Sequence, residues 1–184
     1  MTKYFFGLGN PGPEYAAARH NVGFMVVDAL AASIGSAQPQ NSPKLFAETY
    51  KFANCLLVKP QTYMNESGRS VRATLEYFKE NVAKRPLILR NVFVIHDDLD
   101  IEVGNYKIQF GTGPKIHNGL NSVYEYLKTE QFWHVRMGVD GRKGDRSITP
   151  SAYVLSEFAN GEKKLIGQVI SDVVRELMKV VGEK

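Results

Sequence analysis

The hydrophobic and polar positions along the chain predict strands that alternate with helices. Residues 3–8 form an apolar run that predicts a buried first strand. Apolar positions then recur at helical spacing over about 21–32, which predicts a helix with one buried face. Residues 45–50 and 55–59 flank the short connection 51–54, so a β-hairpin is expected there.

The second half of the chain continues this alternation. Ser67 is a candidate cap for a helix with apolar positions as far as Phe78, and Pro86 is expected to stop that helix. Residues 88–96 are the most strand-like segment, with 92–95 expected to be buried on both faces. The apolar stripe of the last helix is interpreted as core packing. The remaining expected elements are strands at 106–110 and 134–139 and helices at about 118–127 and 161–181.

These elements indicate an α/β fold. The length of 184 residues fits a single domain over residues 1–184, and no internal repeat or polar linker divides the chain. Because strands alternate with helices apart from one hairpin, we expect a mixed, largely parallel twisted sheet surrounded by helices.

Composition and charge narrow the class of protein. A chain that is 43% hydrophobic and 23% charged is typical of a folded domain rather than a disordered one. The single cysteine, Cys55, excludes an internal disulfide and a multi-cysteine metal cluster. Apolar runs fall short of the roughly 18 residues of a membrane span, so we expect a cytoplasmic protein with no membrane partner. The net charge of +4 leaves open whether an RNA or phosphate ligand binds.

A glycine pattern follows the first predicted strand. Residues 7–12 match GxGxxG, which raises the possibility of a dinucleotide site. Such a site needs a helix that begins at the glycines, whereas Pro11 and Pro13 remove two N–H donors and favour a rigid turn. An acidic residue at the end of a second strand is also missing, since Asp28 lies inside a predicted helix. The turn is therefore expected to present Asn10 at the carboxyl edge of the sheet.

Two histidine segments lie at the ends of predicted elements. In Arg19-His20-Asn21, the histidine is either structural or catalytic, and Asn21 is a candidate helix cap. His96-Asp97-Asp98-Leu99-Asp100 ends the long strand, where so many polar groups are unusual for packing. One interpretation is a magnesium or manganese site. The other uses one carboxylate to accept a hydrogen bond from a histidine ring, which makes the other ring nitrogen a better base.

Two further loops carry amides ahead of predicted helices. The segment 59–68 contains Asn65 and fits either a ligand-lining loop or a turn capped by Asn65 or Ser67. His117-Asn118-Gly119 places another asparagine in the same context. No serine or cysteine lies in a GxSxG turn, and Cys55 falls within an apolar strand, so covalent catalysis has no obvious nucleophile.

Taken in order, these segments resemble the bacterial peptidyl-tRNA hydrolases. The matching blocks span nearly the whole chain and are Gly7–Gly12, Arg19–Phe24, Lys59–Asn65, His96–Asp100, His117–Leu120 and Tyr153–Ser156. The resemblance implies hydrolysis of the ester that joins a peptide to the 3′ ribose of tRNA, so that both are released for reuse in translation. It also implies a sheet wrapped by helices, no metal or other cofactor, and a monomer without an obligate protein partner.

Carried over by position, the resemblance implies that His20 is the general base on water and that Asp97 orients it. An aminoacyl ester is already activated, so this chemistry needs neither a metal nor a covalent intermediate. Neutral amides would bind the peptide and stabilise the oxyanion. The residues implied in substrate binding are Asn10, Tyr15, Tyr63, Met64, Asn65, His117 and Asn118.

The tRNA contacts, to the acceptor stem and 3′ end, are expected to be mainly with phosphate and ribose, because the substrates share shape rather than base sequence. Two positions depart from the family pattern. Pro114-Lys115-Ile116 replaces part of a glycine-rich run, which is expected to place bulk near Asn118. Gln109 stands where a lysine that contacts the 5′ phosphate is expected, which would reduce tRNA affinity. The candidate tRNA-binding residues are Lys107, Arg136, Arg142 and Lys143.

Two alternatives to a metal-free esterase stay open. The altered loop 111–116 and Gln109 would suit a non-catalytic RNA-binding module on the same scaffold. His96–Asp100 would suit a metal-dependent phosphoesterase. Hydrolysis of N-acetyl-aminoacyl-tRNA in the presence of a chelator separates these three hypotheses.

Overall fold

The computed structural model describes residues 2–35, 38–83, 87–145 and 147–182, and within these ranges seven strands form one sheet, ordered β2-β3-β4-β1-β5-β7-β6. The strands are β1 Lys3–Gly7, β2 Gln40–Ser42, β3 Ala47–Lys51, β4 Cys55–Pro60, β5 Leu89–Glu102, β6 Tyr106–Phe110 and β7 Phe132–Asp140. The helices are α1 Val22–Ile34, α2 Ser67–Tyr77, α3 Asn118–Leu127, α4 Pro150–Leu155 and α5 Asn160–Gly182. Short 3₁₀ turns are η1 Pro13–Tyr15, η2 Arg19–Asn21, η3 Pro43–Leu45 and η4 Met64–Glu66.

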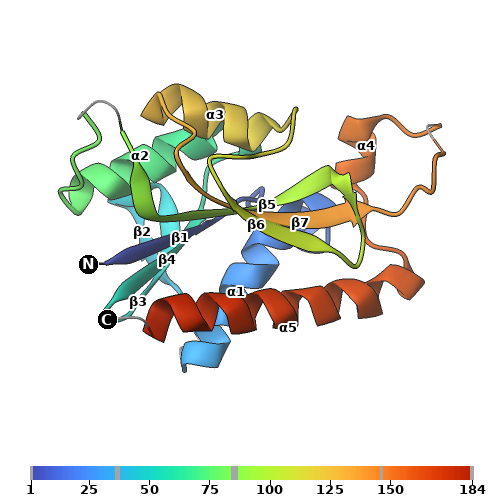
Figure 1. Cartoon of the computed structure of the whole chain (residues 1–184), viewed down its shortest axis with the longest axis horizontal. Coiled ribbons are helices and arrows are strands. Elements are labelled where there is room, and N and C mark those ends of the chain that lie inside the picture. Colours follow the sequence, from blue (N-terminus) through green and yellow to red (C-terminus); the bar gives the residue numbers. More distant parts are fainter. Residues whose placement is uncertain (1, 36–37, 84–86, 146, 183–184) are drawn as a thin grey trace.

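The centre of the sheet is parallel and its edges are antiparallel. Strands β4, β1, β5 and β7 run in one direction, whereas β2, β3 and β6 run against their neighbours. Helices α2 and α3 cover one face, and α1 and α5 cover the other (Figure 1). This arrangement confirms the expected α/β fold with a mixed, largely parallel sheet.

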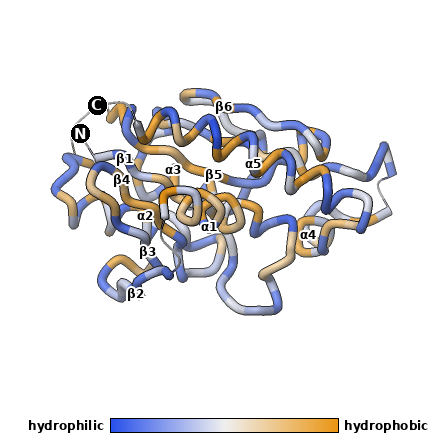
Figure 2. The backbone as a smooth tube through the Cα atoms, turned by 90° about the horizontal axis from the view of Figure 1, so that it is seen from below, coloured by the Kyte–Doolittle hydropathy of each residue, from blue (hydrophilic) through white to orange (hydrophobic). Residues whose placement is uncertain are grey.

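Alternation along β1 supplies both layers of the core. Tyr4 and Phe6 pack with the apolar residues of α2 and α3, whereas Phe5 packs with those of α1 and α5. The apolar stripe predicted for the last helix lies on the core, since Val169, Val173 and other apolar residues of α5 are buried. Figure 2 shows the resulting alternation of hydrophobic and hydrophilic residues along α5.

Several predicted boundaries change because of contacts between distant residues. β5 does not end at His96 but continues to Glu102, since β7 pairs with it as far as Glu102↔Asp140. Ser67 does not cap α2, because its hydroxyl donates to the Met64 carbonyl oxygen. The helix ends at Tyr77, and Pro86 lies outside the described residues. The polar edge strand β2 and the short helix α4 are additions to the predicted elements.

Two glycines let α1 lie directly on the strands. A Cβ at Gly7 would overlap the carbonyl of Gly23, and a Cβ at Gly23 would overlap the Ile95 carbonyl oxygen and the Leu8 backbone. The first turn of α1 therefore contacts β1 and β5 through main-chain atoms, immediately after His20. Among the described residues, no helix combines the length and apolar character that crossing a membrane requires.

Candidate active site

The site lies where β5 extends past the end of β1. The two strands pair as far as Gly7↔Ile95, so His96 and Asp97 follow directly beyond the last paired residue of β1. The chain leaves β1 for the turn that holds Asn10 and then reaches η2, which carries His20. The carboxyl ends of parallel strands are the usual place for ligands in open α/β sheets.

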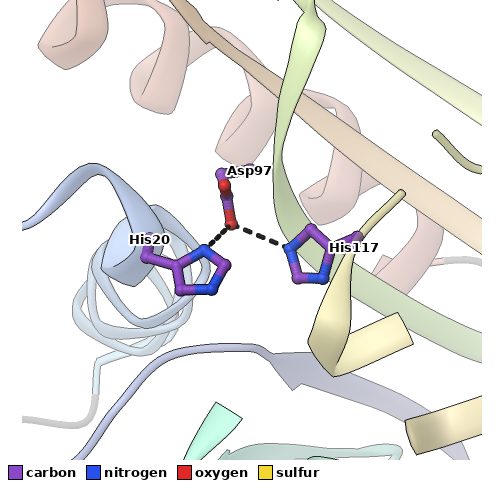
Figure 3. A group of neighbouring side chains, drawn as sticks. All are labelled: His20, Asp97 and His117. Atoms are coloured by element: carbon purple, nitrogen blue, oxygen red, sulfur yellow. Dashed lines mark hydrogen bonds and ion pairs between the residues drawn. The ribbon is translucent and has the colours of Figure 1, made fainter. Parts of the chain in front are cut away.

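Asp97 joins two histidines that come from opposite faces of the sheet. Its Oδ1 lies 2.7 Å from Nδ1 of His20 and 2.9 Å from Nε2 of His117 (Figure 3). The Asp97 side chain is 3% exposed and that of His20 is 11% exposed, so the pair is buried and only the histidine reaches the surface. The structure therefore brings together His20 and Asp97, as the predicted mechanism requires.

Hydrogen bonds fix which nitrogen of each ring carries the proton. Nδ1 of His117 accepts from the backbone N–H groups of Gly119 and Leu120, so its Nε2 must be the protonated nitrogen that donates to Asp97. A carboxylate only accepts, so Nδ1 of His20 is a donor as well. The Nε2 atom of a neutral His20 therefore keeps its lone pair, as a general base needs.

The two imidazoles keep Asp97 ionised in a buried position. Burial alone would raise the pKa of the Asp97 carboxyl, but the adjacent rings of His117 and His20 hold that pKa well below its usual range. An ionised Asp97 can orient His20 and stabilise the imidazolium that forms when the base takes a proton.

The four histidines of the sequence form a row of ring contacts. Ring centroids are separated by 5.1 Å between His20 and His117, 5.2 Å between His117 and His96, and 5.7 Å between His96 and His134. Burial lowers the pKa of His134 to about 4 and holds that of His96 well below its ordinary value. His96 and His134 are therefore neutral at pH 7, which limits the positive charge behind the site.

Asn21 holds the main chain of Asn10. Its Oδ1 accepts from the Asn10 N–H at 2.9 Å, and its Nδ2 donates to the Asn10 carbonyl at 2.8 Å. It occupies the N-cap position of α1 but makes no side-chain capping bond, so the expected capping role is wrong. The side-chain Oδ1 of Asn10 accepts from Met64 N–H at 2.8 Å, which leaves its Nδ2 as the group able to donate to a substrate.

The other predicted substrate-binding residues lie on three short segments. Tyr63 and Asn65 are exposed around η4, whereas Met64 is buried beside the position of Gly119. Asn118 is the exposed first residue of α3, and Tyr15 is partly exposed in η1. His117 differs from these residues, because its side chain is 3% exposed and both of its ring nitrogens bond within the protein. Sequence reasoning predicted a substrate contact for His117, but these bonds use the ring to position Asp97.

Arg19 makes contacts that sequence reasoning missed, and they hold the segment that leads into His20. The Arg19 guanidinium lies 4.3 Å from the Tyr153 ring centroid and bonds Glu162 at 2.6 Å. The Arg19 N–H donates to the Ser156 carbonyl, so the segment that follows β7 and α4 is tied to η2. Thr149 caps α4 with Pro150 at its first position, a signal that could have located this helix.

Of the four predicted tRNA-binding cations, two are exposed, one is partly buried and one is buried. Lys107 and Lys143 are exposed. The Arg142 side chain is 7% exposed and forms a bidentate pair with the Asp140 carboxylate. The hydrogen bonds to Asp140 raise the pKa of Arg142 and occupy donors of its guanidinium. The predicted phosphate contact of Arg142 stays a prediction. Arg136 is also largely buried, 10% exposed at its side chain, and its Nε donates to Asp98 at 2.7 Å.

The two departures from the family pattern have clear structural positions. Gln109 accepts a hydrogen bond from Nη1 of Arg136 at 2.8 Å, so Gln109 and Asp98 both bond that guanidinium. Ile116 is 84% exposed and lines a groove of about 340 Å³ with Leu99 and Arg142. Ile116 precedes His117 and Asn118 in the chain, and its effect on the mouth of the site stays a prediction.

The donor groups do not favour a metal. The ligand atoms of His20, Asp97 and His117 lie within 4.8 Å of one another. The protonated Nε2 of His117 points at the carboxylate, however, and a metal ligand must offer a lone pair. Asp98 is bonded to Arg136 and Asp100 is exposed, so the acids of the second predicted metal site do not converge.

Cofactor and nucleophile alternatives also lack support in the geometry. The turn after β1 leads into the 3₁₀ turn η1 rather than an α-helix, so it lacks the helix N-terminus that a dinucleotide pyrophosphate uses. Cys55 is buried in β4, and burial raises the pKa of its thiol to about 11. Such a thiol is a poor nucleophile at neutral pH.

Comparison with known proteins identifies the family to which this chain belongs. The sequence pattern of a family described as peptidyl-tRNA hydrolase matches residues 4–184. The peptidyl-tRNA hydrolase of Solidesulfovibrio magneticus is 40% identical over 97% of this chain and 86% of the relative, and that of Aquifex aeolicus is 36% identical over 97% and 90%. The crystal structure of peptidyl-tRNA hydrolase from Acinetobacter baumannii superposes with a TM-score of 0.82, at 30% identity, over 98% of this chain and 88% of that one. The chain therefore belongs to the peptidyl-tRNA hydrolase family.

Proposed function

We propose that this protein hydrolyses the ester of peptidyl-tRNA, with His20 as the general base and Asp97 as its orienting partner. The observation that carries the proposal is the bond between His20 Nδ1 and Asp97 Oδ1, 2.7 Å long, which leaves Nε2 free for a water molecule. Nε2 takes a proton as the water oxygen attacks the ester carbonyl carbon. The same proton then passes to the departing ribose oxygen, giving a free peptide acid and a tRNA with a free hydroxyl.

Asparagine amides hold the peptide and the developing oxyanion in this proposal. The amide of Asn10 is oriented by Met64, so its Nδ2 donates to a substrate oxygen. Asn65 and Asn118 are exposed on neighbouring turns and supply further donors and acceptors. Losing one oxyanion donor typically costs about 10²–10³ in rate. His117 acts through Asp97 as a positioning residue and does not contact the substrate.

The tRNA is held mainly through its phosphates. Lys107 pairs opposite Arg136 in the antiparallel register of β6 and β7, so both side chains lie on one face of the sheet. Lys143 is exposed in the loop that follows β7. We assign phosphate contacts to Lys107 and Lys143, with Arg136 contributing where its guanidinium reaches the surface.

The test is hydrolysis of N-acetyl-aminoacyl-tRNA in a buffer that contains a chelator. We expect His20→Ala to lower turnover at least about a hundredfold, as loss of a general base does, with folding and tRNA binding nearly unchanged. Asp97→Asn should be milder, because the base survives with poorer orientation. A His20→Ala variant with near-wild-type turnover would remove His20 from the base role.

The same assay separates the two alternative functions. An RNA-binding module would bind tRNA without releasing the labelled amino acid. A metal-dependent phosphoesterase would lose all activity in the chelator and recover it with magnesium or manganese. We further expect a monomer that acts in the cytoplasm, and analytical ultracentrifugation at micromolar concentration measures the oligomeric state.

A further inference from the structure

Four aromatic side chains stand side by side across four neighbouring strands. They are Phe5 of β1, Phe93 of β5, Trp133 of β7 and Phe110 of β6, and the strand register pairs each one with the next. Ring centroids are 4.9 Å apart between Phe5 and Phe93, 5.9 Å between Phe93 and Trp133, and 5.4 Å between Trp133 and Phe110. Phe5 and Phe93 are buried, whereas Trp133 and Phe110 are only partly buried. The row therefore runs from the core to the edge of the sheet.

A pocket of about 470 Å³, called here the Trp133 pocket, opens beside this row. Its apolar lining comes from the sheet through Phe93, Ile108 and Trp133, and from α5 through Leu177 and Val180. Helix α5 covers this face of the sheet (Figure 1). Sites for small molecules are typically concave and mostly apolar, with volumes of about 300–1,000 Å³ and a few polar groups that orient the ligand. The Trp133 pocket has this size and this lining, so its polar groups decide which ligand it suits.

The charged side chains of the Trp133 pocket favour an anion. Arg90, Lys3 and Glu176 line it. Lys3 donates to a main-chain carbonyl of α5, and the Glu176 carboxylate pairs with Lys179 at 2.8 Å. Because Lys179 offsets the charge of Glu176, the surplus charge around the pocket is positive.

A bulge in β5 positions Arg90 at the outer end of the aromatic row. Residues 89 and 93 of β5 pair with consecutive residues of β7, so residues 90–92 form a bulge against that strand. Bulges re-aim side chains and are frequent beside functional sites. The guanidinium carbon of Arg90 lies 5.0 Å from the Phe110 ring centroid, and the side chain is exposed. A guanidinium stacked on a ring keeps its N–H donors at its edges, where they can bond the oxygens of a phosphate.

The Trp133 pocket lies toward the opposite end of the parallel strands from the active site. Lys3 opens β1, and Trp133 is the second residue of β7. Asp97 lies four residues beyond Phe93 on β5, which is about 13 Å along the strand. A ligand of the Trp133 pocket is therefore separate from the ester on which His20 acts.

We propose that the Trp133 pocket binds a nucleotide, with the base against Trp133 and the phosphate at Arg90. Nucleobases stack on aromatic side chains whatever their sequence, and a guanidinium forms charge-assisted hydrogen bonds with phosphate oxygens. A free nucleoside monophosphate and a nucleotide within an RNA strand offer the same chemistry. The proposal does not depend on the hydrolysis of peptidyl-tRNA.

Trp133 is the only tryptophan of the chain, so its fluorescence reports on the pocket directly. The full chain is titrated with AMP, adenosine and ribose 5-phosphate, and N-acetyltryptophanamide corrects for absorption by the base. We expect AMP to quench the Trp133 emission and to bind about tenfold more tightly than adenosine or ribose 5-phosphate, because each of these lacks one of the two contacts. An emission that AMP leaves unchanged would overturn the proposal.

Arg90→Ala isolates the phosphate contact. We expect the Kd of AMP to rise about tenfold, the usual effect of losing a charged hydrogen bond, while the Kd of adenosine stays at its wild-type value. The matched control is Arg175→Ala, which removes the same charge from α5 at a side chain that is 69% exposed, pairs with Asp172 and lies outside the lining of the pocket. This control should bind AMP as the wild-type protein does.

The variants also show which results contradict the site. A wild-type Kd of AMP in Arg90→Ala would overturn the proposal, and so would equal increases in Arg90→Ala and Arg175→Ala, because the effect would then be one of net charge. An equal increase for adenosine in Arg90→Ala would overturn the assignment of the phosphate to Arg90.

A short oligoadenylate distinguishes the two sources of the nucleotide. Binding that is tighter than that of AMP, with the same loss in Arg90→Ala, assigns the pocket to an RNA strand. Equal or weaker binding assigns it to a free nucleotide. Quenching by the oligoadenylate that is unchanged in Arg90→Ala would overturn the proposal.

Discussion

His117 joins two functions that substitution can separate. Its Nδ1 caps α3 by accepting from Gly119 and Leu120, and its Nε2 donates to Asp97 at 2.9 Å. An asparagine at this position can still cap the helix but is too short to reach the carboxylate. His117→Asn therefore removes the bond to Asp97 alone, whereas His117→Ala removes both interactions.

The structure gives the expected magnitudes. A hydrogen bond to a charged group is worth about 1.5–3 kcal/mol, so His117→Asn should lower the free energy of unfolding by about 2 kcal/mol. His117→Ala should cost about 1 kcal/mol more, the usual value of a lost N-cap. Since Asp97 then orients His20 less well, kcat should fall about 10–100-fold in both variants. KM should change little, because both ring nitrogens of His117 already bond within the protein.

Urea unfolding and steady-state hydrolysis of N-acetyl-aminoacyl-tRNA measure these effects. Both variants are compared with the wild-type protein at pH 7, at a temperature where each is fully folded. Equal stabilities of His117→Asn and His117→Ala would show that the cap contributes nothing. Wild-type kcat in His117→Asn would refute the inference that His117 positions Asp97.

Three further predictions concern the residues around this pair. Asn21→Ala removes two hydrogen bonds to the buried main chain of Asn10 and should lower the free energy of unfolding by about 1–3 kcal/mol. The value of kcat/KM should also fall. Wild-type values of both quantities would show that Asn21 does not hold Asn10 in place. Burial lowers the pKa of His134 to about 4 in the folded protein. Between pH 4 and 6.5 the unfolded chain therefore binds more protons at this residue than the folded protein does. The free energy of unfolding should fall by about 3 kcal/mol as the pH decreases over that range. Urea unfolding should show a smaller fall in His134→Leu, and an equal fall would refute this origin. Gln109→Lys places a second cation beside Arg136, and the slope of log Kd for tRNA against log salt should steepen by about 0.7–0.9 if the new cation meets a phosphate; an unchanged slope would show no such contact.

Local patterns were sufficient to predict most of the fold. The strand at 106–110 and the helix at 118–127 have the predicted bounds, because turn residues and apolar periodicity mark both ends. The extension of β5 past His96 was not predictable in this way. Its polar residues form strand only because β7 pairs beside them, and such pairing depends on residues some 40 positions away.

The site was predictable in its reacting groups and less so in their support. His20 and the asparagines lie at or near the ends of strands and helices, and Asp97 lies at the predicted end of its strand, so position along the chain indicated them. Local reasoning assigned Asn21 to a helix cap, whereas it bonds a residue 11 positions earlier. The contact between Arg19 and Tyr153 joins segments far apart in sequence, so the local pattern of apolar and polar residues could not predict it.

The glycine contact beneath α1 has a consequence for how this enzyme tolerates change. Gly7 and Gly23 let the helix approach the sheet until main-chain atoms are in contact, with no side chain between them. The distance between His20 and Asp97 therefore depends on this main-chain contact more than on the size of nearby core side chains. We expect exchanges among nearby apolar side chains to disturb this spacing less than one added methyl group at either glycine, which would move α1 off the strands and His20 away from Asp97.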